Sequence, residues 1–363
     1  MRIEGIDLLR GLAVSVVVLY HFFEILKLHN HFLYPYITSI GQIGVPLFFI
    51  ISGYLIYRSI EYSIAKKGKN SGIKYFFLHR IFRIIPAYYV NFLVVFLLAY
   101  FIFGTMQTWS TDFTVKQILS HLTFTSYFFY QTSGLGINGA YWTLSIEMLW
   151  YFVAPLLFLF IKKDRYYLVI IGIALLYLWS IDLGLFDKFF HLDKTQPNYM
   201  AKLFFFSFQL PGQIIYFMSG IFIYKYLSSK YNDPVPTTLK WILFLLIMGI
   251  FIFLSHQPFY TSSFLVRNLI TLVIVTALFV LLYQSHIRQL FFVDWVGKIS
   301  YSIYLWHMPI LYLFALYILP YHYSLASVAI LFVVILLFIS TLSYYYIEEG
   351  GFRLRQRLEK KLN

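Results

Sequence analysis

Two ionisable residues in apolar stretches of the sequence have the chemistry of a general base. His21 follows Arg10 by eleven residues in one stretch, and Glu147 follows the run 141–146 at the start of another. At 1.5 Å per residue, Glu147 lies ~9 Å from the start of its helix, and His21 about two turns from the end of its own. Because a carboxylate can fix a histidine tautomer and stabilise the imidazolium, a pair at matching depth predicts a His–Glu base.

The alternative is that His21 and Glu147 each hydrogen-bond a helix neighbour and perform no chemistry. Ionisable groups inside membrane-crossing helices are costly to bury and usually mark a site or a pathway, which favours function. A second histidine, His307, ends the run Ser300–His307. For His307, a structural hydrogen bond and a catalytic role both remain open.

Arg80 and Arg83 form an Arg-x-x-Arg pair just before an apolar stretch. Residues three apart share one face of a helix, so the two guanidinium groups could clamp phosphates. Basic residues also anchor helix ends on the cytoplasmic side of a membrane. From these residues alone, the anchor is the favoured interpretation.

The composition indicates a membrane protein. Hydrophobic residues make up 60% of the 363 residues and charged residues 12%, against ~25% charged in soluble domains. The chain has no cysteine, which excludes a disulfide framework, a thiolate metal site and a cysteine nucleophile. The net charge is +13, and the basic residues lie between apolar stretches and at the C-terminus. We therefore interpret them as a topology signal and expect no nucleic-acid partner. We also expect no metal.

We therefore expect an all-α polytopic transmembrane bundle in the lipid bilayer. A membrane-crossing helix needs ~20 mainly apolar residues. Ten ranges meet this need: 8–26, 41–57, 84–104, 141–161, 166–182, 203–223, 239–255, 264–283, 299–319 and 325–346. A further short helix over 116–122 is expected along the outer surface.

The distribution of basic residues predicts the orientation. With the N-terminus in the cytoplasm, most of the 28 Lys and Arg residues fall on the cytoplasmic side, as the positive-inside rule requires. Both termini are then cytoplasmic. We divide the chain into a transmembrane domain, 1–350, and a short basic cytoplasmic tail, 351–363.

Five stretches in chain order carry a family resemblance. They are Leu9–Ala13 with His21 at Arg-x10-His spacing, Phe48–Tyr54, the Arg80-x-x-Arg83 pair, Trp142–Glu147 and Ser300–His307. Together they resemble the acyltransferase-3 family of integral membrane acyltransferases, which modify bacterial surface polysaccharides and other hydroxylated acceptors. The resemblance implies an acyl-CoA donor (acetyl-CoA by default), no permanently bound cofactor, a glycan hydroxyl as acceptor, and the bacterial cytoplasmic membrane.

The resemblance also implies roles for individual residues. His21 would deprotonate the acceptor hydroxyl, and Glu147 would orient His21 or polarise the acceptor. Three arginines would hold the CoA phosphates: Arg10, Arg80 and Arg83. Five residues would line a tunnel or the acceptor site: Trp142, Ser145, Tyr301, Tyr304 and His307.

Several alternatives stay open. Some family members carry a fused extracellular SGNH hydrolase-like domain, and nothing in this sequence supplies one. We therefore expect either direct acylation of the acceptor or transfer to a separate extracytoplasmic protein. We favour direct attack over an acyl-histidine intermediate. A transporter for a polysaccharide or lipid-linked sugar, with His21 and Glu147 as a proton relay, is the main rival function.

Overall fold

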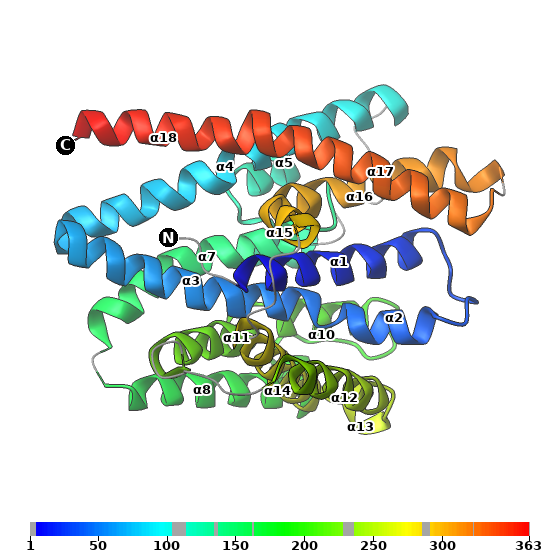
Figure 1. The fold of residues 1–363 in the computed structure, drawn as a ribbon. Helices are drawn as coiled ribbons and strands as arrows, with labels where there is room; N and C mark the ends of the chain where they lie inside the picture. The colour runs from blue at the N-terminus through cyan, green and yellow to red at the C-terminus, as the bar shows by residue number, and fades with distance from the viewer. Residues whose placement is uncertain are drawn as a thin grey trace. The chain divides into compact units, whose positions relative to one another are not determined.

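The computed structural model describes residues 5–103, 114–133, 137–161, 163–227, 236–284, 291–321 and 323–362. All regular elements in these ranges are helices (Figure 1). The longer ones are α1 (Ile6–Ile25), α3 (Gly44–Lys67), α4 (Lys69–Phe103), α7 (Tyr141–Phe160), α8 (Arg165–Asp182), α11 (Leu210–Phe222), α12 (Thr237–Ser255), α14 (Phe264–Gln284), α16 (Ser300–Tyr317), α17 (Leu325–Ser343) and α18 (Glu349–Leu362).

The described residues contain ten helical segments that are long and apolar enough to cross a membrane, and each overlaps one predicted range. The prediction of a ten-span helical membrane protein is therefore confirmed. Several helices run further than predicted. The longest, α4, has 35 residues, or ~52 Å, against a hydrocarbon core of ~30 Å. Its first turns, which include Lys69 and Lys74, therefore extend beyond the core.

The chain divides into two compact units. The first comprises Met1–Val17, Pro35–Ser59 and Phe152–Gly297, and the second comprises Val18–Tyr34, Ile60–Tyr151 and Lys298–Asn363. Nearly all of the predicted site residues, His21 and His307 among them, fall in the second unit. Arg10 belongs to the first unit, where it lies half-buried on α1.

Glycines allow backbone contact between α3 and α11 in the first unit. A Cβ atom added to Gly53 would lie 2.1 Å from the carbonyl oxygen of Phe217, and one added to Gly220 would lie 2.1 Å from that of Ile50. Any larger residue would force these helices apart. Small residues serve this purpose in membrane bundles, where close van der Waals contact drives association.

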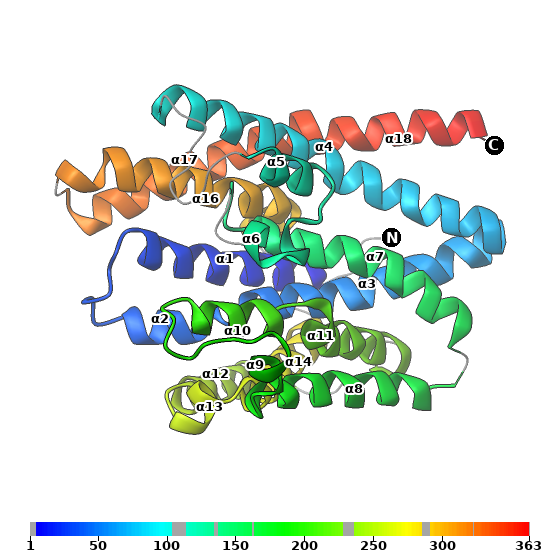
Figure 2. The same ribbon diagram turned by 180° about the vertical axis from the view of Figure 1, so that it is seen from behind.

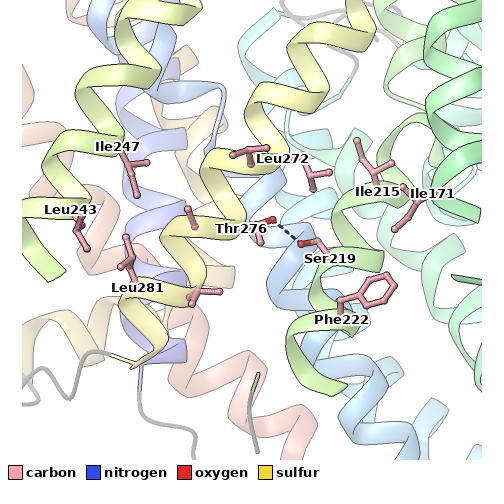
Figure 3. A pocket seen from close by; sticks show the side chains of 12 residues that line it. Ile171, Ile215, Ser219, Phe222, Leu243, Ile247, Leu272, Thr276 and Leu281 are labelled. Carbon is pink, nitrogen blue, oxygen red and sulfur yellow. Dashed lines mark hydrogen bonds between the residues drawn. The ribbon is translucent and has the colours of Figure 1, made fainter. Parts of the chain in front are cut away.

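The first unit also contains an apolar pocket of about 660 Å³ between α8, α11, α12 and α14 (Figure 3). Two of its lining residues are polar, Ser219 and Thr276, and their hydroxyl groups hydrogen-bond each other at 2.7 Å. The remaining walls are aliphatic and aromatic, with Ile171, Phe222 and Leu272 among them. The pocket therefore offers few polar groups that could orient a ligand.

The predicted short helix is present as α5 (Val115–Leu122), drawn beside α6 (Tyr130–Ser133) in Figure 2. Three of its polar residues are buried, Gln117, Ser120 and His121, while Val115 is 73% exposed and Leu119 is 56% exposed; Lys116 is exposed as well. A helix lying in water shows the opposite arrangement. The polarity of α5 therefore fits contact with lipid on its outer face.

His121 should make folding stability depend on pH. Its Nδ1 lies 2.8 Å from the Gln117 carbonyl oxygen, and burial lowers its pKa from 6.5 to about 4. Because the unfolded chain binds this proton more readily, stability is lost as pH falls from 6.5 towards 4, by up to about 3 kcal/mol. Thermal unfolding in detergent across this range should show the loss. The His121→Asn variant, which keeps a donor but cannot titrate, should show a smaller slope.

Candidate active site

Two histidines from distant parts of the chain meet in the second unit. His21 on α1 and His307 on α16 have ring centroids 5.1 Å apart. The Nε2 atom of His307 lies 3.2 Å from Nδ1 of His21. His307 is fully buried at 0% exposure, and His21 is half-buried. The arrangement joins the two histidines that the sequence singled out separately.

The backbone determines the tautomers of this pair. Nδ1 of His307 lies 2.7 Å from the carbonyl oxygen of Tyr304, and a carbonyl can only accept, so this nitrogen carries the proton. Nε2 of neutral His307 then has a lone pair and accepts from Nδ1–H of His21. In neutral His21 the lone pair is therefore on Nε2. A histidine held in this way is oriented to take a proton at Nε2, the role of a general base.

A proline beside His307 explains how this part of α16 is held. Pro309 has no N–H, so the carbonyl of Leu305 loses its helical partner. Asn138 donates its side-chain N–H to that carbonyl at 3.0 Å, and to the side-chain oxygen of Asn91 at 3.2 Å. Both asparagines are buried. Neither was predicted from the sequence, although a polar Asn91 within an apolar stretch was an available signal.

Three of the residues predicted to line the site cluster around the start of α7. The hydroxyl groups of Tyr304 and Thr143 are 2.6 Å apart, and Ser145 lies 3.2 Å from Ser126. Trp142, half-buried, lies between Thr143 and Tyr141 on the same first turn. Tyr304 is also the residue whose carbonyl orients His307. Tyr304 thus connects the start of α7, through Thr143, to the histidine pair, through His307.

Glu147 is hydrogen-bonded to Tyr151, whose ring lies next to Arg80. Its Oε1 accepts from the hydroxyl of Tyr151 at 2.7 Å, and the guanidinium of Arg80 lies 5.7 Å from the centroid of the Tyr151 ring. Arg80 and Glu147 also interact electrostatically. His307 is thus in direct contact with His21, whereas the pairing of Glu147 with His21 stays a prediction.

The Arg80-x-x-Arg83 pair lies within α4, about three turns after its start. The Nε atom of Arg80 is buried and, among the described residues, has no hydrogen-bond partner. Directly after Arg83, the carbonyl of Ile84 accepts a hydrogen bond from the Tyr301 hydroxyl at 3.0 Å. Tyr301 therefore ties α16 to the segment of α4 that carries both arginines.

Comparison with known proteins identifies the family. A model of the acyltransferase-3 family, described as an acyltransferase domain, matches residues 3–348. The chain is 28% identical over 334 residues to the peptidoglycan O-acetyltransferase OatA of Listeria monocytogenes, covering 85% of this chain and 49% of that protein. A Staphylococcus aureus relative named "Putative O-acetyltransferase" is 26% identical over 343 residues, covering 85% of this chain and 50% of its own.

The chain thus spans about half the length of these two bacterial relatives. A viral relative, "Putative acetyltransferase ORF330" of Acidianus two-tailed virus, is 26% identical over 301 residues. This match covers 83% of this chain and 81% of the viral protein. No solved structure matches. Because the family model covers all the described helices from α1 to α17, the chain belongs to the acyltransferase-3 family of membrane acyltransferases.

Proposed function

We propose that the protein transfers an acyl group, acetyl by default, from cytoplasmic acyl-CoA to a hydroxyl of a cell-surface or lipid-linked glycan. The membrane would be the bacterial cytoplasmic membrane, with both termini in the cytoplasm. The observation that carries this proposal is the hydrogen-bonded pair of His21 and His307. This pair would supply an oriented base inside a membrane protein of an acyltransferase family.

In the proposed reaction, Nε2 of His21 takes the proton of the acceptor hydroxyl. The acceptor oxygen attacks the thioester carbonyl carbon, the C–S bond breaks, and CoA leaves as a thiolate that recovers the proton. Because a thioester is already activated, alignment and proton removal are the main requirements. Direct attack needs no acyl-enzyme. Transfer to a separate extracytoplasmic protein would use the same step with a different acceptor.

We assign the phosphates of the donor to the arginines. Arg80 has a buried Nε atom that lacks a partner, and a bidentate phosphate contact would satisfy such a group. Arg83 lies on the same face of α4, and Arg10 is assigned with them from the family resemblance. Glu147, next to Arg80 through Tyr151, would then keep the empty site from carrying an uncompensated positive charge.

The Arg83→Ala variant should weaken donor binding. Loss of one phosphate contact should raise the apparent KM for acetyl-CoA about tenfold, or about 1.4 kcal/mol, with little change in kcat. Lys74→Ala, an exposed basic residue on the same helix, is the matched control and should leave KM unchanged. Equal KM values in both variants and the wild type would return the arginine pair to the role of a topology anchor.

The proposed function is tested with purified protein in liposomes and radiolabelled acetyl-CoA. We expect release of CoA and labelling of a glycan acceptor, both dependent on His21. The rival function, a transporter that uses His21 and Glu147 as a proton relay, predicts no consumption of thioester. Mass spectrometry of surface glycans from a deletion strain would identify the acceptor.

A further inference from the structure

The C-terminal helix α18 packs on α4 at a point where one backbone carbonyl of α4 lacks its helical hydrogen bond. Pro86 has no N–H, so the carbonyl of Phe82 lacks its helical partner. A Cβ atom on Gly351 would lie 2.6 Å from that oxygen and 3.1 Å from Cγ of Pro86. Only a glycine allows α18 to come this close. The contact is directly beside Arg83.

A second contact lies beside Arg80. Arg355 of α18 donates from its Nη1 to Nδ1 of His79 at 2.9 Å. Because a guanidinium can only donate, Nδ1 is unprotonated and Nε2 of the neutral ring carries the proton. That nitrogen is 3.0 Å from Oε1 of Glu359, which is also 3.3 Å from Nε of Arg355. One hydrogen bond and two short contacts to the Glu359 carboxylate thus hold these three side chains together, and His79 is next to Arg80 in the chain.

The start of α18 is also anchored. A π-helical turn, Tyr344–Glu348, joins α17 to α18, and π-helical turns are rare and often occur at functional sites. This turn places Glu348 in the interior, where its Oε1 accepts from the Ser302 hydroxyl of α16. Ser302 follows Tyr301, whose hydroxyl bonds the Ile84 carbonyl of α4. The arginine-bearing segment of α4 is therefore connected to α18 directly and through α16.

We propose that α18 is a positioning element of the donor site, and that the cluster of His79, Arg355 and Glu359 fixes the orientation of Arg80 and Arg83. This inference rests on the proposed function, in which these arginines bind CoA phosphates. Arg355 acts through α4 and does not itself contact the donor. The basic C-terminal segment would then set the affinity for the acyl-CoA donor in addition to its role as a topology signal.

Two arginines of α18 provide a matched test. Arg355 faces α4, whereas Arg357 is exposed. We expect Arg355→Ala to raise the apparent KM for acetyl-CoA about tenfold, with kcat within about twofold of the wild type, and to weaken CoA binding measured by calorimetry to the same degree. Arg357→Ala makes the same change in charge and should alter neither quantity. Equal behaviour of the two variants would overturn the inference.

A double variant separates positioning from direct contact with the donor. Exchanging the two charges, as Arg355→Glu with Glu359→Arg, keeps the cluster intact if the neutral His79 ring adopts its other tautomer. We expect this double variant to recover most of the lost affinity. If residue 355 contacted the donor directly, the double variant would not recover affinity, and that result would contradict the proposal. Recovery in a variant that also lacks His79 would contradict it too.

Two further outcomes have distinct meanings. If the wild-type protein neither consumes acetyl-CoA nor binds CoA, the proposed function fails and this inference fails with it. If the wild-type protein does both and only the α18 comparison is negative, the inference alone fails. Should Arg355→Ala not fold, Glu359→Gln makes the same comparison with a smaller perturbation.

Discussion

Replacement of His21 by alanine is expected to abolish acyl transfer, with kcat lower by about 10²- to 10⁴-fold, the range that general base catalysis contributes. The reason is the geometry of the pair: Nδ1–H of His21 donates to Nε2 of His307, so the lone pair of the neutral His21 ring is on Nε2. The donor phosphates are assigned to other residues. Binding of CoA, measured by calorimetry, should therefore change little in His21→Ala.

A histidine outside the pair of His21 and His307 provides the control. His256, at the end of α12, is exposed and bonds its ring nitrogen to the carbonyl of Ile252. The His256→Ala variant should retain wild-type turnover. Full turnover in His21→Ala with normal expression would refute the general base assignment. A parallel loss of CoA binding would indicate that His21 shapes the donor site.

Helices crossing the membrane could be predicted from the sequence because lipid forces the backbone to satisfy its own hydrogen bonds. Apolar length alone then identifies a span. Helix ends could not be predicted equally well. Lys69 to Arg83 was expected to lie outside a span, since its charges resist lipid, yet the segment continues as the first turns of α4. Charged residues indicate where a helix leaves the hydrocarbon core, but they do not terminate the helix.

The basic C-terminal segment shows what charge counting overlooks. Residues 351–363 were predicted to be a short basic tail, and most of them belong to α18. The less exposed residues Phe352, Arg355 and Glu359 recur at helical spacing, while Arg353 and Arg357 are exposed. This periodicity was present in the sequence. The partners of the buried face, His79 and Gly351 against Phe82, depend on tertiary contact and could not be predicted.

The depth of His21 in its predicted span indicated a functional role, but depth alone could not identify the residue beside it. Residues at equal depth on different helices meet only if the helices are adjacent and rotated towards each other, and a single sequence specifies neither. The sequence left the role of His307 open, and the structure brings His307 against His21. The buried Asn138 that supports this part of α16 lies in a connecting segment, where apolar patterning carries no information.

The role of His307 can be tested by two substitutions that differ in one property. His307→Phe removes the nitrogen that accepts from His21, whereas His307→Gln retains an acceptor oxygen on a side chain of moderate length. We expect His307→Phe to lower kcat roughly 10²-fold or more, because His21 can then adopt the wrong tautomer. His307→Gln should stay within about tenfold of the wild type. The KM for acetyl-CoA should change little in either variant.

The comparison of the two variants decides between three roles. Equal and severe loss in both, with normal CoA binding, would mean that His307 itself exchanges protons with the substrates. Normal activity in both would mean that His21 is oriented by another group, and Glu147 would be the first residue to examine. Activity retained with glutamine and lost with phenylalanine is the result expected of a positioning residue. Since the Tyr304 carbonyl already fixes the proton on Nδ1 of His307, we expect this third outcome.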